Sequence, residues 1–399
     1  MNGLTRLVLS AAALLTLTSA VSAESVKFGA VYALTGPGAT GGEGGMKGTE
    51  LAISQVNDNG GLKKHGGAQI ELIKGDSQSK PINAVGEAER MITQNGVILV
   101  LGAATSNETI PLSQVTEKYG IPHINTIAQA ASLTDGSHKW TWSTTLIDSD
   151  YVIGIFRALD MVRSIEPKLT KIAVLCPDNE YGLEMGKQVK AEFAKRSDLT
   201  LAAFIDYGAQ ALDLLQPVLK VKASRPDVVV QIGYFRGGVL AAKAYEQLDF
   251  HPIIIGTGGM SGDPKLRAEI GNLVQWQFAV TPFSVDLAEA RSISEAFRQK
   301  FNEGLTLNSA LGYFGTFVAA RAVDRAKSFK PDDIAEALRS MKIGKGEMVT
   351  SSDFLQFDAN GRNQGRNTTL TQFQGDHLVT VWPPEKASAK PVLKGFNTP

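Results

Sequence analysis

The sequence predicts an α/β protein built from two doubly wound parallel-sheet lobes joined by hinge crossovers. Strand-like apolar segments alternate with amphipathic helical segments over most of the 399 residues, which is typical of parallel sheets with helices on both faces. The alternation occurs in two successive sets, and the chain is longer than one domain usually needs. Segments without a clear period separate the sets and are suited to crossovers between lobes.

The first 23 residues have the pattern of a secretory signal peptide. Arg6 precedes the apolar run LVLSAAALLTLTSA, and Val21-Ser22-Ala23 forms a small-x-small exit. We expect cleavage after Ala23. This run is too short to span a bilayer, and no later run is long enough for a membrane helix. The mature chain is therefore expected to be soluble and exported.

The first set of elements is expected to form most of an N-terminal lobe. Its predicted strands are 26–34, 68–76, 97–102 and 121–127, and its helices are 46–60, 81–96 and the segment that follows the turn at 103–106. The second set is expected to form a C-terminal lobe. Its predicted helices are 150–162, 181–196, 212–224 and 237–248, and its strands are 171–176, 200–208, 227–235, 252–259 and 273–283. Pro217 is best placed in the first turn of its helix.

Two crossovers and a return of the chain define the expected domain boundaries. The crossovers are placed near 140–150 and 280–286, followed by helices at 287–302, 309–328 and 331–342. SSDFLQFDANGRN predicts a hairpin around Asn360-Gly361, and 382–391 is expected to be a surface extension. The N-terminal lobe is thus assigned to 24–144 and 283–345. The C-terminal lobe is assigned to 145–282 and 346–399.

Composition and motifs argue against several classes of function. Forty basic and forty acidic residues cancel, so net charge gives no indication of nucleic acid. Cys176 is the only cysteine and is interpreted as a small core residue. The five histidines form no HxxH or HExxH pair, so no metal site is expected. There is no G-x-S-x-G elbow, and no cofactor is expected.

The segment GPGATG, from Gly36 to Gly41, matches the dinucleotide pattern G-x-G-x-x-G. Many glycines lie in this region, and no acidic residue follows at the expected distance. We therefore interpret it as a flexible turn that lets backbone approach a ligand or the opposite lobe.

The stretch VILVLGAATSNETIPLSQVTEKYG predicts an anion site. A buried strand runs into a turn of small residues and then into a helix. The first backbone N–H groups of a helix lack partners within it, and together with nearby hydroxyls they favour a negative group. Thr105, Ser106 and Asn107 are the candidate ligand contacts.

Aromatic residues at two later strand ends are further candidates. Asp178-Asn179-Glu180 is interpreted first as a helix N-cap cluster, whereas Tyr181 can face a cleft. Tyr234, Phe235 and Arg236 follow another strand. They suit an apolar ligand with a carboxylate, and packing of an arginine at a lobe surface is the equal alternative.

The chain resembles the leucine/isoleucine/valine-binding family of type I periplasmic binding proteins, the Venus-flytrap solute receptors of ABC transporters. The resemblance covers essentially the whole mature chain. It is carried by GAVYALTGPGATGGEGGMKGTELAISQVNDNGGL, Asp76 to Gln78, GAATSNETIPLS and PDNEYG. It implies that Ser106 binds a ligand α-carboxylate and that Ala128 contacts the ligand through its backbone. Tyr181 and either Tyr234 or Phe235 match cleft aromatics.

Three positions depart from the pattern of that family. Gln129 stands where the family has threonine, Gly258 where it has the acid that pairs the ligand ammonium, and Gly41 where it has an aromatic. A buried ammonium without an acid is costly. These departures favour a ligand that keeps a carboxylate but lacks the amine, such as an aromatic or bulky aliphatic acid. Branched-chain amino acids remain the family default.

The expected function is capture of a small carboxylate-bearing solute between two lobes, without catalysis. The resemblance implies delivery to a membrane ABC permease, location in the periplasm, and a monomer with no nucleic-acid partner. Two alternatives remain: a sensing subunit for a membrane receptor, and an exported hydrolase on the same scaffold.

Overall fold

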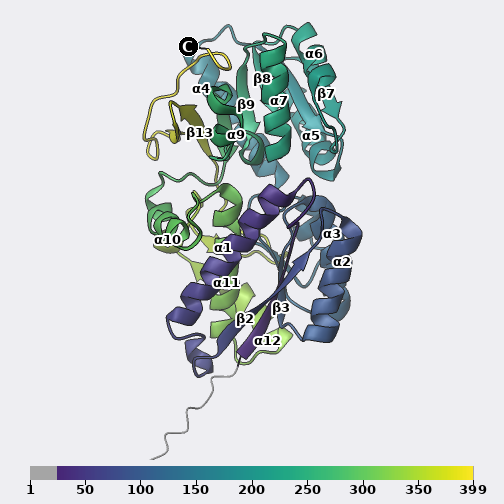
Figure 1. Ribbon diagram of the computed structural model, residues 1–399, viewed down its shortest axis with the longest axis vertical. Helices are drawn as coiled ribbons and strands as arrows, with labels where there is room; N and C mark the ends of the chain where they lie inside the picture. The colour runs from purple at the N-terminus through teal and green to yellow at the C-terminus, as the bar shows by residue number, and fades with distance from the viewer. Residues whose placement is uncertain (1–24, 399) are drawn as a thin grey trace, which may run out of the picture.

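The computed structural model describes residues 25–398, so the predicted signal peptide lies outside the described residues. Two sheets, one in each lobe, follow one another along the long axis of the molecule (Figure 1). The first sheet is entirely parallel, with strand order β2-β1-β3-β4-β5. Its strands are β1 (Ser25–Tyr32), β2 (Gln69–Asp76), β3 (Leu99–Gly102), β4 (His123–Asn125) and β5 (Thr141–Ser143).

The second sheet has strand order β14-β13-β10-β9-β8-β6-β7. Its strands are β6 (Lys171–Pro177), β7 (Thr200–Tyr207), β8 (Val228–Gln231), β9 (Ile253–Thr257), β10 (Phe278–Thr281), β13 (Thr369–Gln374) and β14 (His377–Trp382). β6 to β10 are parallel, whereas β13 and β14 add an antiparallel edge. The predicted fold class, two wound parallel-sheet lobes, is confirmed, but the sequence pattern does not reveal that its last strands form this antiparallel edge.

Helices cover both faces of each sheet because alternate strand residues point to opposite sides. Phe28 and Tyr32 belong to the core under α1 and α11, whereas Val31 belongs to the core under α2 and α3. The helices of the first lobe are α1 (Ala39–Asp58), α2 (Pro81–Arg90), α3 (Ser106–Tyr119), α10 (Arg291–Phe301), α11 (Leu307–Arg325) and α12 (Pro331–Ser340). Those of the second are α4 (Asp148–Ile165), α5 (Glu180–Phe193), α6 (Leu215–Ala223), α7 (Phe235–Gln247), α8 (Gly258–Ser261) and α9 (Leu266–Ile270).

The glycine-rich segment is mostly helical, and its interpretation as a flexible turn is wrong from Ala39 onward. α1 begins there and runs through the glycines. A Cβ on Gly48 would lie 2.0 Å from the backbone oxygen of Ser309, and one on Gly312 would lie 2.3 Å from that of Gly45. Glycine is unfavourable inside a helix, but here it lets α1 and α11 pack backbone against backbone.

The crossovers between the sheets lie close together in space. The first follows β5, a short strand within the segment predicted as a crossover, and the second follows β10. On the return of the chain, residues 361–363 pair alongside Ser143 before the chain enters β13. The predicted turn at Asn360-Gly361 is present, with Gly361 N–H donating to Asp358 O over 3.1 Å.

The division of the chain into lobes remains a proposal, and the packing adjusts its last boundary. Met348, Val349, Leu355 and Phe357 pack in the core of the first lobe. We therefore propose that the last crossover lies after Phe357, later than the predicted boundary at residue 346. The short strands β11 (Lys342–Ile343) and β12 (Leu355–Gln356) pair within this region.

Three smaller sequence expectations have clear outcomes. Cys176 is 1% exposed at the end of β6, as a core residue should be, and Pro217 is the third residue of α6. The C-terminal tail is not a plain surface extension. Lys386 donates to the backbone oxygen of Ser351 over 2.6 Å, and beyond the extension Phe396 is 1% exposed.

Candidate functional site

A cavity of about 160 Å³ lies between the two lobes, at the carboxyl ends of their parallel strands. This is the usual ligand position in open α/β sheets. The volume has room for about ten water-sized groups, so a small solute fits. Nine of the ten predicted contacts line it: Thr105, Ser106, Asn107, Ala128, Gln129, Tyr181, Tyr234, Phe235 and Arg236.

The wall from the first lobe is the N-terminus of α3. Gly102 has φ of +109°, and a Cβ there would lie 2.2 Å from the backbone oxygen of Val31, so the turn after β3 requires glycine. Thr105 is the extended N-cap residue, and Ser106 and Asn107 open the helix. Their N–H groups cannot bond within α3. The strand and the turn thus present backbone donors and the Ser106 hydroxyl to the cavity.

Glu108 also lines this wall and was not among the predicted contacts. Thr105 Oγ1 donates to Glu108 Oε2 over 2.5 Å, and Ser77 Oγ donates to Glu108 Oε1. The T-x-x-E spacing is the sequence signature of a capping box, although the Thr105 side chain makes no cap bond of its own. The Glu108 carboxylate, 1% exposed, is therefore occupied by two hydroxyl donors.

The turn at Ala128 is held by an asparagine. Ala128 N–H donates to Asn125 Oδ1 over 3.0 Å, and Asn125 Nδ2 donates to Ala128 O over 2.7 Å. A ligand contact through this backbone, as the resemblance implies, would have to share these groups. Gln129 Oε1 and Asn107 Oδ1 are buried and have no hydrogen-bond partner among residues 25–398, so both remain available to a ligand.

The wall from the second lobe is aromatic. The rings of Tyr181 and Tyr234 lie 5.2 Å apart at 41°, and burial raises the pKa of both hydroxyls, so both stay protonated. Asn179 Oδ1 accepts from Gly182 N–H over 3.1 Å. The predicted N-cap role is therefore present in Asn179, and the same residue lines the cavity.

Arg236 is the positively charged residue of the cavity lining, and Glu108 is the negatively charged one. Of the described residues that line the cavity, these two alone carry a formal charge. Arg236 Nη2 donates to the backbone oxygen of Ala211 over 3.1 Å, which leaves the rest of the guanidinium able to bind an anion. The cavity thus has a helix N-terminus on one wall and a cation on the other.

Gly258 is the predicted contact that does not line the cavity. A Cβ there would lie 2.8 Å from Leu307 Cδ2 and 3.0 Å from Thr281 Oγ1. Gly259 lines the cavity instead, so this turn offers no acid from either position. Gly41 lines the cavity, but a Cβ there would lie 2.8 Å from Asn308 Nδ2. Asn308 therefore occupies the place that the missing aromatic was expected to leave open.

Further lining residues were not among the predicted contacts, although Thr40 lies in the glycine-rich segment that was expected to approach a ligand. They include Thr40, Ser79, Ile127, Tyr207, Gln210, Leu307, Asn308 and Leu311. Tyr207 ends β7, so the strand-end reasoning that found Tyr181 would also have found it. Leu307 and Asn308 begin α11, and only the packing of α11 against α1 brings them to the cavity.

Three other structural observations bear on function. In the part of the chain from 25 to 398, no cluster of three potential metal ligands occurs. His123 is a core histidine whose Nε2 contacts Gly102 O at 2.5 Å. Within the same residues no helix combines the length and apolar character that crossing a membrane requires.

Comparison with known proteins gives consistent results. A family model described as periplasmic binding protein matches residues 25–376. The Leu/Ile/Val-binding protein homolog 7 of Brucella suis is 29% identical, covering 94% of this chain and 95% of its own. Homolog 8 of Brucella abortus is 28% identical, covering 97% and 98%.

Solved structures share the fold. A branched-chain amino acid transporter substrate binding protein from Streptococcus pneumoniae, in complex with isoleucine, aligns with a TM-score of 0.77 at 23% identity. It covers 93% of this chain and 100% of its own. A solute binding protein from R. palustris, in complex with benzoate, aligns with a TM-score of 0.79 at 18% identity, covering 92% and 97%.

Proposed function

The chain belongs to the periplasmic binding protein family, and on that premise we propose that it captures a small carboxylate-bearing solute between its lobes. It then delivers the solute to a membrane ABC permease. The observation that carries this proposal is the cavity itself, which joins free donors at the N-terminus of α3 to the aromatic wall of the second lobe. Because both lobes contribute to the cavity, a bound solute stabilises their closed arrangement.

The ligand-binding residues are proposed to be the nine predicted contacts that line the cavity, with Ser106 and the backbone of α3 on the carboxylate. Tyr181, Tyr234 and Phe235 would cover the apolar part. Arg236 would favour the anion from the opposite wall.

Two solute classes are candidates. Relatives are named for leucine, isoleucine and valine, and one protein of the same fold holds benzoate. In this cavity Glu108 already accepts two hydroxyl donors, and neither Gly258 nor Gly259 supplies an acid. An ammonium would therefore meet no free carboxylate among the described residues that line the cavity, which favours an amine-free aromatic or bulky aliphatic acid.

We further propose that residues 1–23 are removed on export, that the mature protein acts as a monomer in the periplasm, and that it performs no catalysis. Sequencing the N-terminus of protein recovered from the periplasm tests the cleavage after Ala23. A chain that begins at Met1 would contradict it.

The test of function is thermal unfolding of the mature protein with a solute panel. The protein is first unfolded and refolded to remove carried-over ligand. The panel holds leucine, isoleucine, valine, benzoate and branched aliphatic acids. A solute at 100 times its dissociation constant adds about 2.7 kcal/mol to the free energy of unfolding. A shift with benzoate or aliphatic acids alone supports the amine-free class, a shift with leucine alone supports the family default, and no shift across the panel contradicts both.

A further inference from the structure

Asp148 is a buried acid at the boundary between the lobes. It is the first residue of α4, just after the first crossover, and is 1% exposed. Its backbone N–H donates to Gln129 O of the first lobe over 3.0 Å. Neither carboxylate oxygen has a partner in full hydrogen-bonding geometry, although the backbone of Ala131 lies close enough to favour the charge. An isolated buried carboxylate is costly, and such groups usually respond by staying protonated.

The charged groups with the largest effect on the pKa of Asp148 are acids. Burial is the largest cause that raises its pKa, to about 8, followed by Glu184, Glu180 and Asp150. Glu180 and Glu184 lie on α5, and Asp150 lies on the same helix as Asp148. Three tyrosine hydroxyls lie nearby, on Tyr151, Tyr181 and Tyr234, and burial keeps all three protonated.

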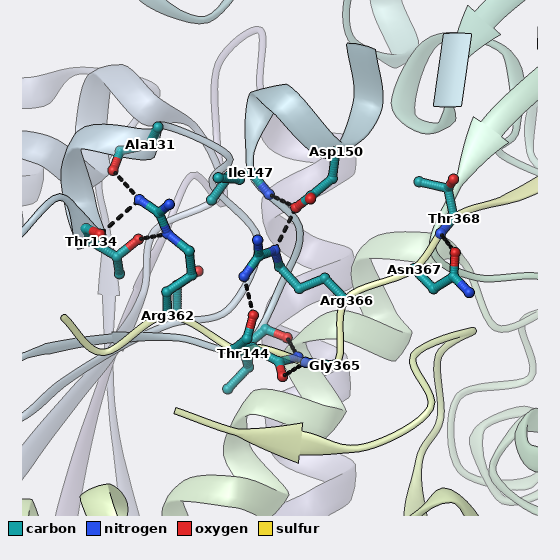
Figure 2. A network of polar contacts seen from close by, with 12 residues as sticks. Ala131, Thr134, Thr144, Ile147, Asp150, Arg362, Gly365, Arg366, Asn367 and Thr368 are labelled. Atoms are coloured by element: carbon teal, nitrogen blue, oxygen red, sulfur yellow. Dashed lines mark hydrogen bonds and ion pairs between the residues drawn. The ribbon is translucent and has the colours of Figure 1, made fainter. Parts of the chain in front are cut away.

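The nearby arginines are already engaged. Figure 2 shows Arg366 donating through Nε to Asp150 Oδ2 over 2.6 Å, while the same oxygen accepts from Ile147 N–H over 2.9 Å. Arg362 donates to the Thr134 hydroxyl over 3.0 Å and to Ala131 O over 3.3 Å. Both arginines lie on the last crossover. Arg362 bonds it to the segment around Ala131, and Arg366 bonds it to the start of α4. Among the described residues the Asp148 carboxylate therefore has no cation partner, whereas Arg362 and Arg366 bond to other groups.

The position of Asp148 ties its burial to the closure of the lobes. On one side lie Gln129 and Ala131 of the first lobe, and on the other lie α4 and α5 of the second. The lobes are closed in this structure, since α3 contacts α5 and α11 contacts α8 across the cleft. Separation of the lobes would move Asp148 away from Gln129 and Ala131 and admit water to its carboxylate.

We propose that Asp148 is a protonation switch of lobe closure: the closed form holds it as a neutral acid, and opening lets it ionise in water. The proposal goes beyond the proposed function and does not depend on which solute binds. Closing then takes up a proton wherever the open form is ionised and the closed form is not, from about pH 4 to pH 8. Across that range the ratio of closed to open protein falls as pH rises, by up to about tenfold per unit, and it levels off above pH 8.

The test measures closure directly, without a solute. Spin labels are attached through Ile82→Cys at the start of α2 and Leu212→Cys beside the cavity loop, where the native side chains are 73% and 82% exposed. Cys176 is buried and stays unlabelled. Double electron–electron resonance on the refolded protein is recorded from pH 5 to pH 9. We expect one short distance at pH 5 and a longer-distance population that grows up to pH 8.

Three variants separate the switch from a merely structural role. Asp148→Asn should keep the short distance at every pH. Glu184→Gln removes an acid that raises the pKa of Asp148, so the change should level off at a lower pH. Asp263→Asn is the matched control, because this acid is also buried with a raised pKa, but its carboxylate accepts from Lys265 N–H over 2.9 Å. It should follow the wild type.

Distances that stay constant from pH 5 to pH 9 in the wild-type background would overturn the proposal. It is equally overturned if Asp148→Asn shows the wild-type shift, or if Glu184→Gln leaves the pH of the plateau unchanged. The solute panel is independent of these results, so a failure of the switch and a failure of the proposed function are distinguishable.

Discussion

Two buried acids occupy the first turns of two helices, one at the cavity wall and one at the hinge. Glu108 is the third residue of α3, Asp148 is the first of α4, and each is 1% exposed. Glu108 receives hydroxyl donors from Ser77 and Thr105, whereas among the described residues neither oxygen of Asp148 has a partner in full hydrogen-bonding geometry. Residue class, helix position and burial are therefore nearly the same, whereas the hydrogen-bond partners differ, and Asp148 also has acids nearby.

The difference indicates two roles for similar side chains. Donors on both oxygens satisfy the hydrogen-bonding capacity of a buried carboxylate and fix the turn that holds it. A buried carboxylate without donors destabilises the folded protein when it is ionised, and protonation or exposure to water removes that cost. Replacing each acid by its amide should thus change stability in opposite directions.

The larger effect is expected at Asp148. Its folded pKa of about 8 lies above the unfolded value near 3.8, so the wild type loses stability as pH rises from about 4 to 8. Asp148→Asn lacks this loss and should raise the free energy of unfolding by about 2–3 kcal/mol at pH 8. This is about half of the maximum gain that a pKa difference of four units allows. Urea unfolding at pH 4.5, 6 and 8 measures it. A gain that does not grow with pH would contradict the assignment.

The opposite sign is expected at Glu108. Glu108→Gln keeps one acceptor oxygen but loses the charge that strengthens both hydroxyl contacts, so the free energy of unfolding should fall by about 1–2 kcal/mol at pH 7. Urea unfolding beside Asp148→Asn makes the comparison direct. If both amides stabilise the protein, or both destabilise it at pH 8, the partners of the carboxylates do not explain the difference.

The smallest effect is expected from one donor alone. Ser77→Ala leaves Glu108 with Thr105 and should cost about 1 kcal/mol, since Ser77 is fully buried. Ser54→Ala is the control, because the Ser54 hydroxyl bonds Asp58 at an exposed position, and it should cost less than about 0.5 kcal/mol. Equal midpoints for the two variants in urea would show that the Ser77 contact contributes nothing.

Sequence patterns predicted the fold well where a strand or helix was long. The apolar runs of β1, β6 and β9 and the amphipathic period of α5 and α7 are strong local signals. β5 was missed because three residues within a polar stretch give no period. The start of α1 was missed because glycines disfavour a helix locally, and only the close approach of α11 makes them suitable there.

The sequence predicted those residues of the candidate site that directly follow the ends of strands. Ser106, Tyr181 and Tyr234 follow the carboxyl ends of parallel strands, which converge on one edge. Asn308 and Leu311 could not be found this way, because they belong to a helix that returns from a distant part of the chain. Asp148 has the sequence context of an ordinary acid at a helix start, and its missing partners emerge only from the packing of the lobes.

The most direct measurement of the central claim is the affinity of Ser106→Ala for the solute that gives the largest shift in the panel. Isothermal titration compares it with the wild type and with Ser113→Ala, a buried serine of the same helix that bonds Ile110 O and does not line the cavity. Loss of a hydrogen bond to a charged carboxylate should weaken binding by about tenfold to a hundredfold, with Ser113→Ala close to wild type. Unchanged affinity in Ser106→Ala would contradict a carboxylate bound at the N-terminus of α3.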